Sequence, residues 1–370
     1  MNYKAYDPYD FKFSYLGNII FKLYYRFGFI ILPLILIGEI MTGVLRIFKV
    51  LKKREYPIVL AFSGLTYLLD NNITKIKNIY YSLIKHEIRL NNGAVAYGLN
   101  VNFPISKDLK YSKDSTFVVI TIYVYRFFIE LSKHKMISDI DNKIYEIESY
   151  FVENVKFELH ANNTITCSYS EINDRTVLNS VAYVLDVYET MKKTNSKCFL
   201  ENTELIENRI KGLKKTIIIN QQIDGSWNYS LSDKTFKDCF HSCFILEVLI
   251  KNYAEDNETK KIILKGYNYL RDNHYDKKLG VLTRYPSETI GLKGLINKLQ
   301  LSLYDSAEFL NITFLLNKKL MMKDIVSDID SVFKNKSQVL RILRPNPYGA
   351  DWKRWGIVQY NYYRKQIEKN

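Results

Sequence analysis

Two side chains in the stretch FKDCFHSCFILEVLIKNY (236–253) are spaced for acid–base chemistry. Asp238 and His241 lie three residues apart in a segment with helical apolar spacing, so they share one face of the expected helix. A carboxylate beside an imidazole can orient the ring and stabilise its protonated form. We interpret His241 as a candidate general acid or base with Asp238 as its partner. A capping aspartate beside a hydrogen-bonded histidine is the structural alternative.

A pair of carboxylates follows in a second apolar helical segment, 302–316. Asp305 and Glu308 are three residues apart and share a helix face. Paired carboxylates suit glycosyl chemistry, so both are candidate catalytic residues. The alternative is a pair that faces solvent or is bridged to a lysine or arginine.

The stretch QQIDGSWNYS (221–230) places large aromatic residues directly behind an Asp-Gly turn. A protein that acts on sugars uses carboxylates for the hydroxyl groups and aromatic faces for the C–H side of the ring. Asp224 is therefore a catalytic candidate, and Trp227 and Tyr229 are substrate-binding candidates. A structural turn with Trp227 packed between helices is the alternative.

Four stretches of the chain share this design, in which a turn residue opens a short extended segment that ends in tyrosine. They are 91–98, 162–170, 224–230 and 279–286, and they end near Tyr97, Tyr169, Tyr229 and Tyr285. Arg284 adjoins Tyr285, and a neighbouring cation can lower the pKa of a tyrosine, so Tyr169 and Tyr285 are acid–base candidates. Tyr97 and Arg284 are binding candidates, and plain aromatic lining is the alternative.

The stretch RILRPNPYGADWKRWG (341–356) combines arginine with tryptophan. Such a combination can bind an acidic sugar or a diphosphate. The binding candidates are Arg344, Arg354, Trp352 and Trp355. The alternative is a helix that completes the fold with its tryptophans inward and its arginines in solvent.

The elements that carry these residues are mostly helices. After Arg54 the apolar spacing is helical, and the four decorated stretches each follow one helix and precede the next. Repeated helix–loop–helix units form helical arrays, and the second helix of each pair is apolar on most of its surface, as in an inner ring. We predict an all-α toroid of helical hairpins over residues 51–370, with the decorated loops gathered on one face.

A long apolar run, Phe27–Leu45, precedes this domain in a separate N-terminal segment, 1–50. It is long enough to span a bilayer, but it contains Pro33 and Glu39, and basic residues flank both ends. Three interpretations stay open: a span, a broken amphipathic helix in the membrane interface, and a hairpin buried in the globular domain. Contact with the inner face of the cell membrane through residues 20–54 is expected, with the protein cytoplasmic.

Composition narrows the partners. The net charge of +14 suits a nucleic acid, an anionic membrane or an acidic glycan, but the basic residues are dispersed and no nucleic-acid motif is present, so we expect no nucleic acid. Cys239, Cys243 and His241 lack a clear fourth ligand for zinc, and no nucleotide-sugar Rossmann pattern is present. We therefore expect neither a metal nor a cofactor.

The helical repeats and the decorated loops resemble those of the α/α-toroid proteins. QQIDGSW is similar to the QW motif of terpene cyclases, without the acidic motifs of those enzymes. Residues 55–370 resemble toroid proteins of bacterial polysaccharide clusters, and 167–189 resembles the C-terminal toroid of glucuronyl C5-epimerases through a V-L-N-x-x-x-Y pattern that includes Asn179. Ser168 stands where the epimerases have glutamate. The resemblance implies a glycan-facing toroid with Asn179 among its binding residues.

These observations predict an enzyme of capsule or exopolysaccharide biosynthesis that acts on an acidic or lipid-linked glycan. The reaction class stays open among epimerisation, transfer, lysis and hydrolysis. A non-catalytic glycan-binding scaffold of the same pathway is the first alternative, and a terpene- or prenyl-processing toroid is the second.

Overall fold

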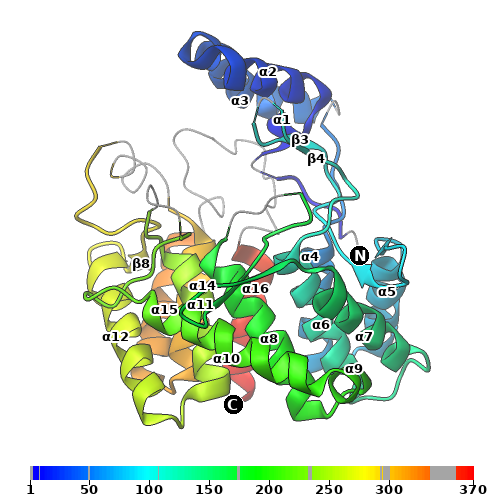
Figure 1. Cartoon of the computed structure of the whole chain (residues 1–370). Helices are drawn as coiled ribbons and strands as arrows, with labels where there is room; N and C mark the ends of the chain where they lie inside the picture. Colours follow the sequence, from blue (N-terminus) through cyan, green and yellow to red (C-terminus); the bar gives the residue numbers. More distant parts are fainter. Residues whose placement is uncertain are drawn as a thin grey trace.

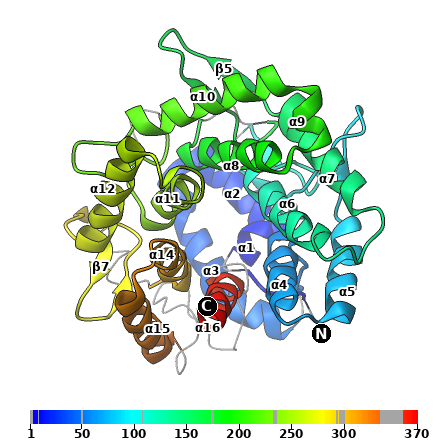
Figure 2. The same ribbon diagram turned by 90° about the horizontal axis from the view of Figure 1, so that it is seen from below.

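Helical hairpins arranged in a ring make up most of the molecule (Figures 1 and 2). The computed structural model describes residues 3–7, 9–48, 51–106, 108–172, 176–231, 236–291, 294, 301–333 and 356–370. Within these, the inner helices each pack on the next, and the last packs on the first. They are α4 (Pro57–Leu69), α6 (Val118–Ser132), α8 (Leu178–Thr194), α11 (Cys239–Tyr253), α14 (Leu303–Leu315) and α16 (Val358–Lys369). This closed ring confirms the predicted all-α toroid.

Outer helices surround five of the inner ones. They are α5 (Ile73–Ile84), α7 (Ile140–Ser149), α10 (Thr203–Ile219), α12 (Asn257–His274) and α15 (Lys319–Phe333), with the short α9 (Lys197–Glu201) and a π-helical turn, η2 (Tyr150–Asn154), between them. The apolar pattern of the sequence differs between the inner and the outer helices. The inner α8 is buried over most of its surface, whereas the outer α12 buries one stripe, including Ile263, Tyr267 and Leu270.

Within the described residues, small antiparallel hairpins lie in three of the connections from an outer helix to the next inner one. They are β1 (Ile88–Arg89) with β2 (Val95–Ala96), β3 (Phe103–Pro104) with β4 (Lys110–Tyr111), β5 (Phe157–Leu159) with β6 (Ile165–Cys167), and β7 (Tyr275–Asp276) with β8 (Val281–Leu282). The connection from α10 to α11 instead has a single β-bridge, between Gln221 and Trp227. All lead into the amino ends of inner helices, so the decorated stretches gather at one end of the ring, which we call the hairpin end.

The register of these hairpins corrects the predicted tyrosine repeat. Tyr169 and Tyr229 are equivalent, because each carbonyl accepts a hydrogen bond from the first N–H of the preceding inner helix, at Val118 and Leu178. In the last repeat Arg284 makes this bond, to the N–H of Cys239. Tyr285 is therefore one residue past the repeat position. Successive side chains of an extended segment point to opposite sides, so the shift changes where the ring lies.

The first repeat shows a displacement of one residue in the opposite direction. The pairing of Ile88 with Ala96 corresponds to that of Phe157 with Cys167, so Tyr97 aligns with Ser168 and not with Tyr169. Its side chain is fully buried. The expectation that all four tyrosines point to the axis is therefore wrong for Tyr97.

The N-terminal segment forms its own helical hairpin across the hairpin end of the ring (Figures 1 and 2). It comprises α1 (Asp10–Phe13), α2 (Tyr15–Phe27), the 3₁₀ turn η1 (Gly28–Ile31) and α3 (Leu32–Ile47). The buried carboxylate of Asp10 accepts hydrogen bonds from Arg46 at 3.2 Å and from Arg54 at 3.0 Å. These bonds tie the base of the N-terminal hairpin to the start of the ring.

The apolar surface of this segment is largely exposed. Among the described residues, Tyr15–Gly38 is long and apolar enough to cross a membrane, and 6% of its most apolar window is buried in the protein. The expectation of a hairpin buried in the globular domain is therefore wrong, because α2 and α3 leave most of their large apolar side chains uncovered.

Candidate functional site

A cavity of about 240 Å³ opens on the ring axis at the hairpin end. The second residue of each of five inner helices contributes to its wall. These residues are Ile58, Val119, Asn179, Phe240 and Tyr304. The remaining lining residues are Leu99, Phe117, Ile120, Tyr169, His241, Phe244 and Arg284. We call this space the mouth cavity.

His241 and Asp238 form a short-range pair at the mouth cavity. Asp238 is the N-cap of α11, and its side chain accepts the backbone N–H of His241 at 3.3 Å. The same carboxylate lies 2.7 and 2.8 Å from Nδ1 of the imidazole. The Asp238 carboxylate thus both caps α11 and orients the imidazole, and Nδ1 of the imidazole donates a hydrogen bond to this carboxylate.

A buried guanidinium completes the charge arrangement. Arg284 lies 3.4 Å from Asp238 and 4.3 Å from the centre of the Phe240 ring. Burial alone would raise the pKa of Asp238, but His241 and Arg284 outweigh it and hold that pKa below its ordinary value. Asp238 is therefore ionised at neutral pH and can stabilise a protonated imidazole.

Aromatic rings surround the imidazole. The Tyr229 ring lies 4.5 Å from that of His241 and stacks on Phe236 at 4.8 Å. Phe240 lies 3.9 Å from His241 on the other side, and Tyr304 packs against Phe240 at 5.0 Å. The arrangement offers a titratable group between aromatic faces, which is suited to a ligand with both apolar and hydroxylated faces.

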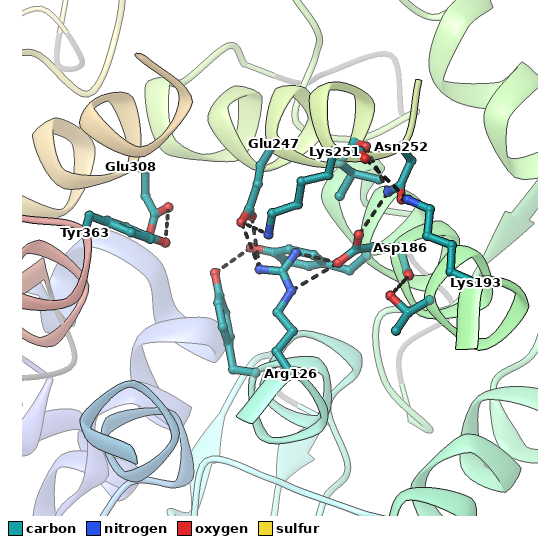
Figure 3. A network of polar contacts seen from close by, with 12 residues as sticks. Arg126, Asp186, Lys193, Glu247, Lys251, Asn252, Glu308 and Tyr363 are labelled. Atoms are coloured by element: carbon teal, nitrogen blue, oxygen red, sulfur yellow. Dashed lines mark hydrogen bonds and ion pairs between the residues drawn. The ribbon is translucent and has the colours of Figure 1, made fainter. Parts of the chain in front are cut away.

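A second cavity, of about 330 Å³, lies at the opposite end of the ring axis, at the carboxyl ends of the inner helices. Arg126 forms its base and pairs with Asp186 at 2.7 Å and with Glu247 at 3.1 Å (Figure 3). Lys251 also binds Glu247, at 2.6 Å, and Asn252 binds Asp186 at 3.0 Å. We call this the far-end cavity.

Several solved structures share this arrangement of helices. An α-mannanase of glycoside hydrolase family 76 from Bacteroides thetaiotaomicron matches with a TM-score of 0.61 and 10% identity over 85% of this chain and 86% of that one. Cellobiose 2-epimerase from Bacillus thermoamylovorans matches with a TM-score of 0.58 and 9% identity over 86% and 90%. A reducing-end-xylose releasing exo-oligoxylanase matches with a TM-score of 0.56 and 10% identity over 85% and 81%. The shared fold is the α/α toroid.

No protein-family model and no curated protein sequence matches the chain. The glucuronyl C5-epimerase resemblance therefore stays a prediction.

Several residues predicted from widely separated segments meet at the mouth cavity of the toroid. They are Tyr169, Asn179, His241 and Arg284 in the wall, with Asp238 directly behind His241 and Tyr229 against its ring. The amide oxygen of the buried Asn179 has no hydrogen-bond partner among the described residues. Their chemical roles stay predictions, but their proximity is a property of the fold.

The Asp-Gly turn does not reach the mouth cavity. Asp224 is exposed, accepts from Ser226 and pairs with Lys237 at 2.6 Å. Trp227 is buried, and its indole N–H donates to the carbonyl of Ile217 at 2.9 Å. The prediction that Trp227 offers its face to a ligand is wrong, because its ring fills the space between the turn and α12.

The two remaining tyrosine predictions also change. Tyr97 is buried away from the cavity wall. Burial raises the pKa of Tyr285, and Arg284 offsets this only in part, so the expected lowering does not occur. Tyr285 packs edge-on against Phe236 at 5.8 Å and belongs to the support of the site.

Asp305 and Glu308 are not a catalytic pair in the mouth cavity. Asp305 is fully buried beside α11, where burial raises its pKa to about 7, and Glu308 lies one turn further along α14. The Tyr363 hydroxyl donates to Glu308 at 3.0 Å (Figure 3). Neither carboxylate lines the cavity, because both are directed toward neighbouring helices.

The predicted residues Arg344, Trp352, Arg354 and Trp355 lie outside the described residues. Among the described residues, no group of three or more His, Cys, Asp or Glu side chains could hold a metal ion. Cys239 and Cys243 are buried free thiols whose sulfur atoms lie 4.0 Å apart.

Sequence reasoning missed the ring of second helix residues. Ile58, Val119, Phe240 and Tyr304 belong to different helices and share no residue type. Their common signal is the distance from the start of each inner helix. This signal can be used only when the first residue of every inner helix is known.

Proposed function

We propose that this protein is a carbohydrate-processing enzyme in which His241 transfers a proton to or from a sugar held in the mouth cavity. The observation that carries the proposal is the His241–Asp238 pair on the wall of an axial cavity, with Arg284 beside it. An oriented imidazole is suited to proton transfer near neutral pH. The three similar toroids bear names of carbohydrate enzymes, which supports the substrate class.

Epimerisation fits the described wall better than hydrolysis. Hydrolysis of a glycoside ordinarily uses two carboxyl groups that flank the bond. The described lining of the mouth cavity contains an imidazole and a guanidinium, and Asp305 and Glu308 are outside it. With Nδ1 bound to Asp238, the imidazole would take a proton from carbon through Nε2. The same nitrogen would return a proton after the planar intermediate has turned its opposite face toward the imidazole. Arg284 would stabilise the negative charge that develops on the adjacent oxygen.

We further propose that the glycan is acidic or lipid-linked and belongs to a bacterial capsule or exopolysaccharide made at the cytoplasmic face of the membrane. The support is the sequence resemblance, the Arg284 guanidinium in the wall of the mouth cavity and the exposed apolar N-terminal hairpin.

Deuterium exchange tests the reaction class directly. The full chain is incubated in D₂O with cellobiose, manno-oligosaccharides, xylo-oligosaccharides and uronic-acid oligosaccharides. Epimerisation adds one mass unit at a carbon-bound position without chain cleavage, whereas hydrolysis creates new reducing ends. We expect exchange with at least one of these, reduced about 10²–10⁴-fold in His241→Ala.

The variants Asp238→Asn and Lys237→Met provide the matched comparison. Asp238→Asn should lower turnover and shift its pH profile, because it removes the charge that stabilises the protonated ring. Lys237→Met, next in sequence, removes the ion pair with Asp224 and a cation contact with the Tyr269 ring, both outside the mouth cavity, and serves as the control. Saccharide binding without exchange or cleavage in the wild type would contradict the enzyme and favour the non-catalytic scaffold.

A further inference from the structure

The mouth cavity has two walls of different chemistry. The side formed by α4 and α6 presents apolar side chains, namely Ile58, Leu99, Phe117, Val119 and Ile120. The side formed by α8, α11 and α14 presents the polar groups of Asn179, His241, Arg284 and Tyr304 beside the apolar rings of Phe240 and Phe244. A free sugar has polar groups around its whole circumference, so one uninterrupted apolar wall does not suit it. A ligand with a polar head and an apolar continuation matches both walls.

The apolar wall lies on the side where the N-terminal hairpin is attached. Residues Ala5 and Arg54 pair through their backbones just before α4 begins. The Phe13 ring packs on Phe103 at 5.5 Å, and Asn18 donates to the Asn102 carbonyl at 3.1 Å, in the β3–β4 region that leads into α6. The hairpin thus stands on the α4–α6 side and extends across the opening (Figures 1 and 2).

The helix α3 distinguishes an inner from an outer face. Ile35, Thr42 and Arg46 are buried, and a Cβ added at Gly38 would lie 2.0 Å from the Phe11 ring of α1. On the other face, the apolar side chains are exposed at helical spacing. They are Leu34, Ile37 and Met41, which are 47, 57 and 41% exposed. One face of α3 therefore holds the hairpin together, and the other has no covering within the described chain.

The helix α2 and the turn extend this apolar surface. Leu16, Ile19, Leu23 and Phe27 recur at helical spacing and are 57, 42, 37 and 51% exposed. Phe29 and Ile30 at the turn are 82 and 80% exposed. A continuous apolar surface of this kind marks an interaction site, and the adjacent exposed Lys22 and Arg26 suit anionic lipid headgroups.

The geometry favours a hairpin that lies in the membrane interface. Gly28, with φ of 65°, ends α2, and the contact between Gly38 and Phe11 shows that the chain folds back. At 1.5 Å per residue, α2 and α3 are about 20 and 24 Å long, shorter than the roughly 30 Å of a hydrocarbon core. The long side chains of Lys22 and Arg26 can reach the headgroups from helices that lie along the surface.

We propose that the substrate is a sugar attached to a lipid carrier, presented by the membrane on which the α2–α3 hairpin lies. The sugar and its linking group bind His241 and Arg284, and the first part of the apolar carrier runs along Leu99 and Val119 toward the hairpin. This inference rests on the proposed function for its sugar head. Its lipid component rests on the cavity wall and on the hairpin alone.

Vesicle sedimentation tests the membrane contact. The full chain is mixed with vesicles of phosphatidylethanolamine and phosphatidylglycerol, and with vesicles of phosphatidylcholine. We expect stronger binding to the anionic vesicles than to the phosphatidylcholine vesicles. The double variant Leu23→Asp/Ile37→Asp should bind the anionic vesicles about tenfold or more weakly, because each change replaces an apolar side chain that would be buried in the lipid. The matched control is Ile223→Asp/Leu320→Asp, at sites that are 95 and 80% exposed on the ring.

Binding of a short amphiphile tests the cavity. Calorimetry compares geranyl phosphate with inorganic phosphate in the wild type, in Val119→Asn and in Leu320→Asn. We expect the wild type to bind geranyl phosphate at least about tenfold more tightly than inorganic phosphate. This difference in affinity should disappear in Val119→Asn and remain in Leu320→Asn. Retained folding of each variant is checked by circular dichroism.

The outcomes separate this inference from the proposed reaction. Vesicle binding and the preference for geranyl phosphate over inorganic phosphate are measured without a sugar, so neither readout depends on the proposed proton transfer. Absence of sugar chemistry together with both binding results would count against the reaction alone. Equal vesicle binding by the hairpin variant and the wild type, or equal affinity for the two phosphates, would overturn the inference.

Discussion

The two ends of the toroid axis each bury an arginine among carboxylates, but they use it differently. At the far end, Arg126 pairs with Asp186 and Glu247, and Asn252 and Lys251 provide each carboxylate with a further partner. At the mouth, one carboxylate, Asp238, serves both His241 and Arg284. At the far end, the neighbouring cations hold the pKa values of Asp186 and Glu247 below their ordinary range despite burial, whereas the mouth network includes an imidazole.

Helix direction explains part of this difference. The inner helices point their amino ends to the mouth and their carboxyl ends to the far end. Partial positive charge therefore gathers at the mouth and partial negative charge at the far end. The far-end cations, among them Lys193 and Lys251, match their helix ends and stabilise the ring. At the mouth, the proposed ligand would supply the matching charge if it is anionic or electron-rich.

The largest expected effect separates the two arginines. Arg126→Met leaves Asp186 and Glu247 short of their main partner in a buried site and should cost about 3–5 kcal/mol of unfolding free energy. Arg284→Met should cost less, about 1–3 kcal/mol, because Asp238 keeps His241, but it should abolish turnover. Urea unfolding and the deuterium-exchange assay measure the two properties.

An exposed ion pair gives the baseline for this comparison. Lys192→Met breaks the pair with Glu207 on the surface of α8 and should change stability by less than about 1 kcal/mol. If Arg126→Met were no more harmful than Lys192→Met, the far-end network would not be a structural clamp.

A smaller effect concerns the pH dependence of stability. Burial raises the pKa of Asp305 to about 7, so its folded form holds a proton that the unfolded chain releases. Stability contributed by that proton is present at low pH and is lost as the pH rises toward 7. From pH 5 to pH 8 the wild type should lose on the order of 2–3 kcal/mol that Asp305→Asn does not lose.

Unfolding curves of both proteins across this range provide the measurement. Asp10 and Glu148 have raised pKa values of about 6 and 7 and act in the same direction, but both proteins contain them, so their effect cancels. Parallel pH profiles would show that Asp305 is ionised in the folded protein at neutral pH.

The smallest effect tests whether Trp227, which lies at the hairpin end, has a packing role. A Cβ at Gly266 would lie 2.5 Å from the Trp227 ring, so Gly266→Ala should cost about 1–3 kcal/mol. In a Trp227→Phe background the shorter ring should reduce that cost by about 1 kcal/mol. Glycan affinity should not change in either variant; weaker affinity at full stability would return Trp227 to the binding site.

Local patterns in the sequence predicted the ring and the end at which its decorated loops gather. Helical periodicity is present in the inner and outer helices, and the Asp238–His241 spacing brings the two side chains together because Asp238 caps the helix that contains His241. Tyr169 and Tyr229 occupy equivalent repeat positions as predicted, but Tyr97 and Tyr285 do not, because a shift of one residue in an extended segment reverses the side-chain direction. Asp305 and Glu308 share a helix face as expected, yet only the packing of α11 and α16 decides that this face is closed.

Closure of the ring carries a consequence for the order of folding. The first inner helix, α4, packs against the last, α16, and the Phe62 and Tyr363 rings meet at 6.0 Å across most of the chain length. Contacts so distant in sequence form late, because the intervening segment must first be ordered. During synthesis the N-terminal hairpin leaves the ribosome long before α16. Attachment of the hairpin to a membrane, as proposed above, would then precede completion of the ring and hold the unfinished toroid at that surface.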